Sequence, residues 1–382
     1  MELTLSDDQQ FFCDTTRRFL ATECPIAQVR ALASADAGFE PGYWRQGGEL
    51  GWTSLLVPES AGGGSVSGSG VIDLTIVADA FGRHVAPGPL LPTNVVAATL
   101  GRDGSGAHAD VLAGLLAGDT VATWCGAEHA LGEGATRATR TADGYRLSGV
   151  STPVEAAAQS QSFLVTARLD DKDPAEGGLG PLVQFLLPAG SDGVTVEPLA
   201  SLDVVRRFAR VEFADVRVPA SAVVAGDAPV ADDVEQQLLH ALVIQAATLV
   251  GAAERVFEFT VEWAFDRYSF GRPLASYQAL KHRFADMKMW LEASHALTSA
   301  LAREIQDGAE GVHETASVTK AYVGHHLTEL LHDCIQMHGG IGLTTDHDLH
   351  LYLRRVVTER SSFGTPADHR RRVAVLAAGA AA

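Results

Sequence analysis

The chain has 382 residues, of which 46% are hydrophobic, 20% charged and 7% aromatic, and its formal net charge is −18. This apolar fraction excludes a mainly disordered chain, and the length predicts roughly two or three domains. The excess of negative charge argues against nucleic acid or an anionic membrane as a partner, although a local basic patch could still bind a phosphate.

The cysteine content and the apolar runs indicate the compartment. The four cysteines form no CxxC pair and are too sparse for a disulfide scaffold. The polar start of the chain shows no signal-peptide pattern. The longest apolar run, residues 241–253, is only 13 residues long and is too short to cross a bilayer. We therefore expect a cytoplasmic protein with no membrane partner, and a buried helix over this run.

The first part of the chain is expected to be helical. Ser6 and Gln9 form a capping-box pattern at the start of the first helix. A Gly- and Ser-rich stretch over residues 61–70 predicts a loop. Further helical segments are expected over residues 44–56, 71–85, 94–100 and 109–116.

From about residue 120 the pattern changes to short alternating segments. Residues 138–141 and 145–147 alternate around Asp143-Gly144, which predicts a β-hairpin. A polar loop is expected over residues 170–180. The other expected strands are 163–169, 182–187, 194–196, 210–213 and 216–218.

After a boundary at residues 226–233 the chain becomes helical again. Long helices are expected over residues 238–267, 277–306, 314–338 and 346–359. The order of these segments predicts an α+β fold with segregated layers. The expected domains are an N-terminal helical domain (1–118), a middle β-barrel or sandwich domain (119–228) and a C-terminal four-helix bundle (229–382).

Three common site patterns find no support. The Gly-rich loop lacks the phosphate-binding GxxxxGK[ST] spacing, so a surface loop is the better interpretation. The histidines of residues 325–332 lack a metal-ligand spacing, and no metal is expected. No GxSxG nucleophile elbow occurs.

One constellation is more specific. Arg267-Tyr268-Ser269-Phe270-Gly271 follows a long helix, and Tyr277-Gln278 opens the next one. Gln336-Met337-His338-Gly339-Gly340 ends a third helix, and Phe363-Gly364-Thr365 follows a fourth. Each piece alone is ordinary, because paired glycines commonly cap helices. Together, in this order, they resemble the acyl-CoA dehydrogenase family of flavoproteins over nearly the whole chain.

The resemblance implies FAD at a subunit interface, held largely by the neighbouring subunit's bundle. Arg267 would donate to the pyrophosphate, Phe270 would pack on the cofactor, and the glycines would let the backbone approach the ADP portion. The implied cofactor-binding residues are Arg267, Phe270, Gln278, Gln336, Gly339, Gly340 and Thr365.

The resemblance also implies α,β-desaturation of an acyl-CoA thioester, in which a carboxylate takes the α proton and the flavin takes a hydride. The family's usual glutamate position is Phe363 here, and the alternative base position falls at Ala241, followed by Leu242. The stretches that touch the flavin ring in the family are altered at residues 127–129 and 153–155. No catalytic residue can therefore be assigned.

This pattern resembles the glutamate-lacking subunit of actinobacterial heterotetramers that act on steroid side chains. The implied partners are a related dehydrogenase subunit, acyl-CoA and an electron-transferring flavoprotein, in a homo- or heterotetramer. Two alternatives stay open: a self-sufficient dehydrogenase with a relocated base, or a catalytically silent protein that binds acyl-CoA or FAD. The candidate relocated bases are Asp346, Glu359, Asp368 and Glu254.

Overall fold

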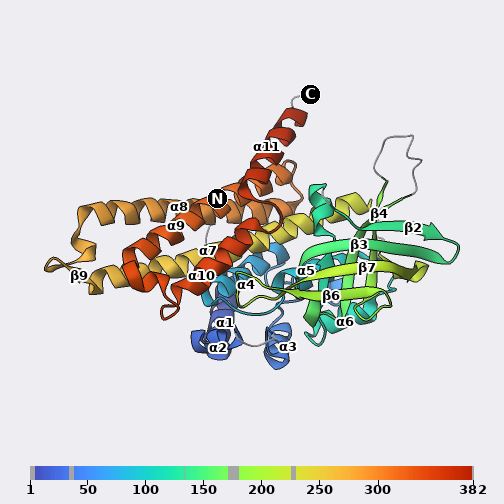
Figure 1. Ribbon diagram of the computed structural model, residues 1–382, viewed down its shortest axis with the longest axis horizontal. Coiled ribbons are helices and arrows are strands. Elements are labelled where there is room, and N and C mark those ends of the chain that lie inside the picture. The colour runs from blue at the N-terminus through green and yellow to red at the C-terminus, as the bar shows by residue number, and fades with distance from the viewer. Residues whose placement is uncertain (1–4, 34–37, 133, 171–179, 225–228, 381–382) are drawn as a thin grey trace.

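Helices, a mixed sheet and a second set of helices follow one another along the chain (Figure 1). The computed structural model describes residues 5–33, 38–132, 134–170, 180–224 and 229–380. This order confirms the expected α+β class. Most of the polar loop expected at 170–180, and the start of the boundary expected at 226–233, lie outside the described residues.

The N-terminal helices pack beneath the long helices of the bundle. They are α1 (Asp7–Glu23), α2 (Ile26–Leu32), α3 (Pro41–Glu49), α4 (Gly70–His84), α5 (Leu90–Arg102) and α6 (Ala109–Leu116), with a 3₁₀ turn η1 (Glu59–Ala61). The capping box is confirmed, because the Ser6 hydroxyl accepts from the Gln9 amide at 3.2 Å and Gln9 Oε1 accepts from the Ser6 amide at 3.1 Å. The helix expected over 44–56 is wrong in its second half: α3 ends at Glu49, and Gly51 adopts a φ of +89° that a helix cannot contain.

The middle strands form one mixed sheet in the order β6-β7-β3-β2-β4-β5-β8, and β1 pairs with β4. The strands are β1 (Ala122–Cys125), β2 (Arg137–Thr141), β3 (Gly144–Glu155), β4 (Ser162–Leu169), β5 (Leu182–Pro188), β6 (Val194–Leu199), β7 (Phe208–Pro219) and β8 (Val223–Val224). The β2–β3 hairpin around Asp143-Gly144 is confirmed. The two strands expected at 210–213 and 216–218 are one strand, β7, which is bent at Asp215, where φ is +53°.

The C-terminal helices are α7 (Val230–Asp266), α8 (Gln278–Asp307), α9 (Val312–His338), α10 (Leu349–Ser361) and α11 (Pro366–Ala380). A small hairpin of β9 (Tyr268–Ser269) and β10 (Arg272–Pro273) joins α7 to α8. The sequence analysis did not expect α11. Thr365 caps its N-terminus, because the Thr365 hydroxyl accepts from the Asp368 amide at 3.3 Å and the Asp368 carboxylate accepts from the Thr365 amide at 2.8 Å.

The central helix α7 lies inside the fold. Within the described residues it is the helix that is long and apolar enough to cross a membrane, but 94% of its apolar window is buried in the protein. It approaches α4 closely, because a Cβ at Gly82 would lie 2.0 Å from the Thr248 carbonyl oxygen and one at Gly251 would lie 2.1 Å from that of Asp79. The apolar run of 241–253 is therefore a buried core helix, as expected.

A buried ion network joins the sheet to the bundle. Arg206 lies between Glu155 of β3 and Glu359 of α10, with its Nε donating to Glu155 Oε1 at 2.7 Å. Arg355 of α10 pairs with Asp203, and both side chains are almost fully buried. These charges have lost their water, and only their mutual pairing makes their burial tolerable.

Lys320 of α9 extends this network to the C-terminus of α10. Its ammonium donates to the carbonyl oxygens of Glu359 at 2.7 Å and Ser362 at 2.8 Å, and also to Gln245 Oε1. Burial lowers the pKa of Lys320 to about 7, although the nearby Glu359 carboxylate raises it in part. The lysine therefore caps helix carbonyls that have no intrahelical donor.

Replacing Arg355 should strongly destabilise the protein. Arg355→Met leaves the Asp203 carboxylate buried without a cation, which should lower the free energy of unfolding by about 3–5 kcal/mol. Arg45→Met, which breaks the exposed pair with Asp119, is the matched control and should cost less than about 1 kcal/mol. Urea unfolding of both variants measures the difference, and equal losses would contradict a stabilising role for the buried pair.

Lys320→Met should reveal a pH dependence of stability. The variant leaves three buried acceptors without their donor, which should cost about 2–4 kcal/mol. The pKa of Lys320 is about 7 in the fold against 10.5 ordinarily. The unfolded chain binds the proton more tightly, so the wild type should gain stability as the pH rises between these values.

Urea unfolding at several pH values above 7 should therefore show the deficit of Lys320→Met widening as the pH rises. Lys288→Met, which removes a half-exposed lysine paired with Glu292, is the control and should show a constant difference. A pH-independent deficit for Lys320→Met would contradict the assignment.

Candidate active site

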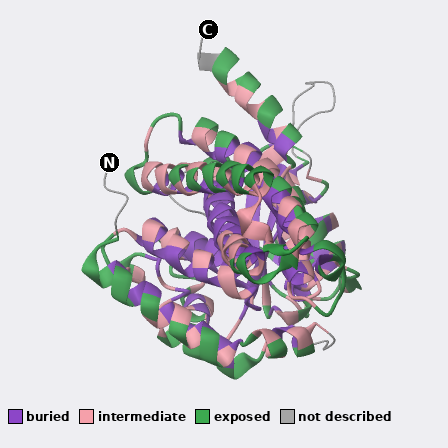
Figure 2. Ribbon diagram, turned by 90° about the vertical axis from the view of Figure 1, so that its left-hand side faces the viewer, coloured by how far each residue is buried: buried purple, intermediate pink, exposed green. Residues whose placement is uncertain are grey.

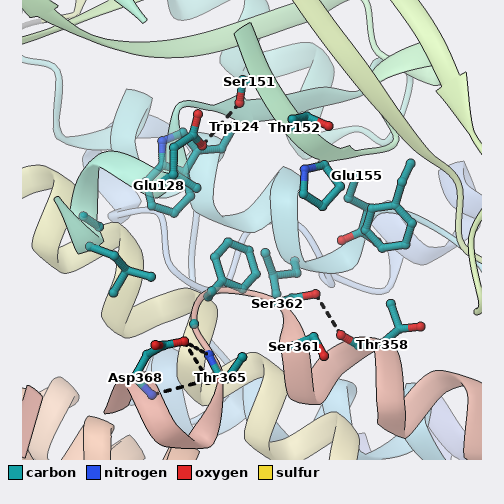
Figure 3. A pocket seen from close by; sticks show the side chains of 18 of the residues that line it. Trp124, Glu128, Ser151, Thr152, Glu155, Thr358, Ser361, Ser362, Thr365 and Asp368 are labelled. Atoms are coloured by element: carbon teal, nitrogen blue, oxygen red, sulfur yellow. Dashed lines mark hydrogen bonds between the residues drawn. The ribbon is translucent and has the colours of Figure 1, made fainter. Parts of the chain in front are cut away.

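A cavity of about 970 Å³ lies between the sheet and the turn that joins α10 to α11 (Figure 3). Its wall includes Ala127 and Glu128 of the 3₁₀ turn η2 (Ala127–Leu131), Pro153 and Glu155 of β3, and Phe363. The fold therefore brings the altered ring-contact stretches and the altered base position to one site. The volume suits a small-molecule site.

The turn at Phe363 is held rigidly in an unusual conformation. Phe363 adopts a φ of +55° and Gly364 one of +90°, and a Cβ at Gly364 would lie 2.9 Å from His369 Nε2. His369 Nε2 donates to the Phe363 carbonyl at 2.8 Å, and Lys320 donates to that of Ser362. Burial lowers the pKa of His369 to about 4, so the ring stays neutral at physiological pH.

An aromatic pair forms part of the wall. The rings of Phe363 and Trp124 of β1 stack with centroids 6.2 Å apart and planes 18° apart. The Trp124 indole N–H donates to the Thr166 hydroxyl at 3.1 Å, which fixes the ring. The sequence analysis missed Trp124, although its place beside the altered 127–129 stretch was a usable signal. It also missed Arg206, Lys320 and His369.

His129 of the same stretch does not line the cavity. It is buried, and its Nε2 lies 2.8 Å from the Thr136 hydroxyl. Glu128 does line it, with the Ser151 hydroxyl donating to Glu128 Oε2 at 3.4 Å (Figure 3). Burial raises the pKa of Glu128, and its hydrogen bonds oppose this in part.

The alternative base position does not face the cavity. Ala241 and Leu242 are 0% and 3% exposed and belong to the apolar core around α7. Neither forms part of the cavity wall.

The candidate relocated bases are occupied elsewhere. Glu254 pairs with Arg83 at 2.8 Å and with His295, and its pKa falls to about 2, chiefly because of the hydrogen bond with His295. Glu359 is bound by Arg206, and Asp368 is bound to the N-cap residue Thr365 and to Arg371. Asp346 is exposed and does not line the cavity. None of the four offers a free carboxylate to the cavity.

A second group of residues gathers away from the cavity. The β9 hairpin that carries Phe270 lies at the opposite end of the molecule from the sheet (Figure 1). Figure 2 looks onto this end and shows exposed loops there. The exposed residues of this group, none of which lines the cavity, are Arg267, Phe270, Gln278, Gln336, Gly339 and Gly340.

Arg267 is linked to Gly339 and Gly340 through the stacked rings of Trp263 and His338. The Arg267 guanidinium lies 5.9 Å from the centre of the Trp263 ring, and Trp263 stacks on His338 with centroids 5.2 Å apart. Gly339 follows His338 with a φ of +66°. Phe270 is 99% exposed.

Thr365 stands apart from this group. It was expected to bind the same cofactor near its phosphates, but it lies on the cavity wall with its hydroxyl hydrogen-bonded to Asp368. Within the described residues no group of histidine, cysteine and acidic side chains is arranged to hold a metal.

Comparison with known proteins identifies the family. Residues 6–119 match the model of the acyl-CoA dehydrogenase N-terminal domain, and residues 232–376 match that of the C-terminal domain. Two relatives from Mycobacterium tuberculosis are acyl-CoA dehydrogenase IpdE2, 27% identical over 97% of this chain and 98% of its own, and acyl-CoA dehydrogenase FadE27, 29% identical over 98% of both.

Solved structures agree with these matches. The crystal structure of the ChsE4-ChsE5 complex from Mycobacterium tuberculosis superposes with a TM-score of 0.86 and 26% identity, over 99% of both chains. The chain therefore belongs to the acyl-CoA dehydrogenase family, whose members are oxidoreductases acting on CH–CH groups.

Proposed function

We propose that this chain is the base-lacking subunit of a hetero-oligomeric, FAD-dependent acyl-CoA dehydrogenase. It holds the adenylate side of a flavin whose ring lies in an unlike partner, and the partner supplies the carboxylate that takes the α proton. This proposal rests mainly on one observation, which is that the residues expected to bind FAD and the residues of the cavity lie at different places in the fold. The residues proposed to bind FAD are exposed at the β9 end, whereas the chain's own cavity has Phe363 at the base position.

The residues at the β9 end suit the pyrophosphate and adenosine of FAD. Arg267 has no carboxylate partner among the described residues and lies over the Trp263 ring, so its planar guanidinium is available for two parallel hydrogen bonds. No atom lies within 4 Å of a Cβ built at Gly339 or Gly340, so a ligand can approach this backbone. Gln278 and Gln336 supply exposed amides, and Phe270 a free ring.

The bound flavin supplies a hydride acceptor for α,β-desaturation. This chain's own residues would bind and orient the adenylate half, while the Trp124–Phe363 pair offers an apolar wall in its own cavity but no proton acceptor. Phenylalanine has no titratable group, so in this proposal the carboxylate that removes the α proton belongs to the partner.

An unlike partner also fits the relatives. The ChsE4-ChsE5 structure is a complex of two different named chains. By analogy we propose a heterotetramer with a related dehydrogenase subunit, located in the cytoplasm, that uses acyl-CoA as substrate and passes electrons to an electron-transferring flavoprotein. The α7 helix, buried within the fold, is compatible with this location.

Co-purification tests the proposal. The chain should be purified alone and after co-expression with a related dehydrogenase subunit that carries glutamate at the position of Phe363 or Ala241. We expect little flavin and no turnover for the chain alone, and about one FAD per pair with turnover for the complex. FAD content is measured by absorbance and turnover with an artificial electron acceptor. Full flavin occupancy and turnover by the chain alone would refute the proposal.

Arg267→Met should weaken flavin retention in that complex. The loss of two charge-assisted hydrogen bonds should raise the dissociation constant of FAD roughly 10- to 100-fold. Arg272→Met is the control on the same hairpin, since the Arg272 guanidinium is already engaged 3.8 Å from the Tyr277 ring centre. Titration of the deflavinated complexes with FAD gives both constants. Equal losses in the two variants would show that hairpin packing, not phosphate binding, is what Arg267 provides.

A further inference from the structure

The charges on the cavity wall are matched except at one residue. The ion pairs of the wall are Glu155 with Arg206, Glu235 with Arg372, and Asp368 with Arg371. Glu128 lines the same cavity and has no ion pair among the described residues. Each of the three cations on the wall is already paired, so an anionic ligand would find a carboxylate and no free positive charge.

Glu128 is oriented as a hydrogen-bond acceptor. The Ser151 hydroxyl accepts from the Gly126 amide at 2.8 Å, which directs its own proton toward Glu128 Oε2 at 3.4 Å. Partial burial of the carboxylate leaves it with few water partners, and this raises its pKa. A ligand that donates a hydrogen bond to Glu128 would replace the hydrogen bonds from water that the carboxylate has lost through burial.

The part of the wall that Trp124 and Phe363 form is apolar, although the wall also carries hydroxyl side chains such as Ser151 and Thr152. Trp124 uses its indole N–H on Thr166, at 3.1 Å, and so presents only ring carbons. Phe363 stacks on Trp124, and its carbonyl oxygen is already bound by His369. Leu131 and Leu91 add aliphatic surface to the same wall.

The geometry points to a second role for this cavity: a non-redox binding site for an uncharged, largely apolar molecule with one hydroxyl group. The hydroxyl donates to the Glu128 carboxylate, and the hydrocarbon packs on Trp124 and Phe363. This inference depends on the proposed function, because a flavin ring in the same cavity would exclude such a ligand. A molecule that ends in a carboxylate binds weakly, since its charge would lie beside the Glu128 carboxylate with no cation between them.

Calorimetric titration of the co-expressed complex with 1-octanol and with octanoate at pH 8 tests the site. Wild type should bind octanol at least roughly tenfold more tightly than octanoate. Glu128→Leu removes both charge and acceptor, so it should weaken octanol binding by about tenfold. Glu128→Gln keeps a carbonyl acceptor without the charge, so it should retain octanol binding and lose much of the discrimination against octanoate.

Glu197→Gln is the matched control, because it removes a carboxylate from the exposed surface of β6, where Glu197 lies 3.3 Å from Arg210. It should leave both affinities unchanged. Equal affinity of the wild type for octanol and octanoate would overturn the inference. So would unchanged affinities in a Glu128→Gln complex with native near-ultraviolet circular dichroism.

Measuring the FAD content of the complex shows whether a negative result contradicts this inference alone or the proposed function as well. About one FAD per pair without selective octanol binding overturns the inference alone. Two FAD per pair, with a flavin spectrum that octanol perturbs, shows that a flavin ring occupies this cavity and overturns both. About one FAD per pair, with octanol binding that leaves the flavin spectrum unchanged, supports both.

Discussion

The architecture of the cavity depends on a buried arginine shared by two carboxylates. Arg206 binds Glu155 of the sheet and Glu359 of α10, so it fixes the distance and orientation between the two walls. Such a cluster has a large desolvation cost, and an apolar core could supply equal stability without it. The cluster contributes a defined orientation, because a planar guanidinium forms good hydrogen bonds with two carboxylates in only a few relative positions. The sheet and the bundle therefore face each other in a defined way.

The same reasoning explains the turn at Phe363. A φ of +55° is unfavourable for phenylalanine, and the turn persists because Lys320 and His369 bind the neighbouring carbonyl groups. The backbone is thus held as a catalytic turn would need to be, although the side chain cannot take a proton. At this turn the wall presents an aromatic ring, which stacks on Trp124.

The sequence predicts the helices, the hairpin and the family well, because capping residues, turn dipeptides and the order of short motifs are local signals. Ser6 with Gln9 and Asp143-Gly144 are such cases. The cavity wall is different. Trp124 and Glu128 lie close together in the chain, but Phe363 comes from a distant segment, and no periodicity shows that it meets them. Thr365 shows the same point, since the fold places it on the cavity wall and apart from the other expected cofactor-binding residues, and its contact with a cofactor stays a prediction.

The exposed apolar side chains at the β9 end bear on how the chain assembles. Phe265, Tyr268, Phe270 and Leu343 are between 63% and 99% exposed. An isolated subunit gains nothing from such side chains in water, and their burial would stabilise an interface. They lie on the same segments as Arg267 and Gly339, so an interface that buried them would also bring these residues to a neighbouring chain. Assembly through this end would therefore bear directly on the proposed cofactor contacts.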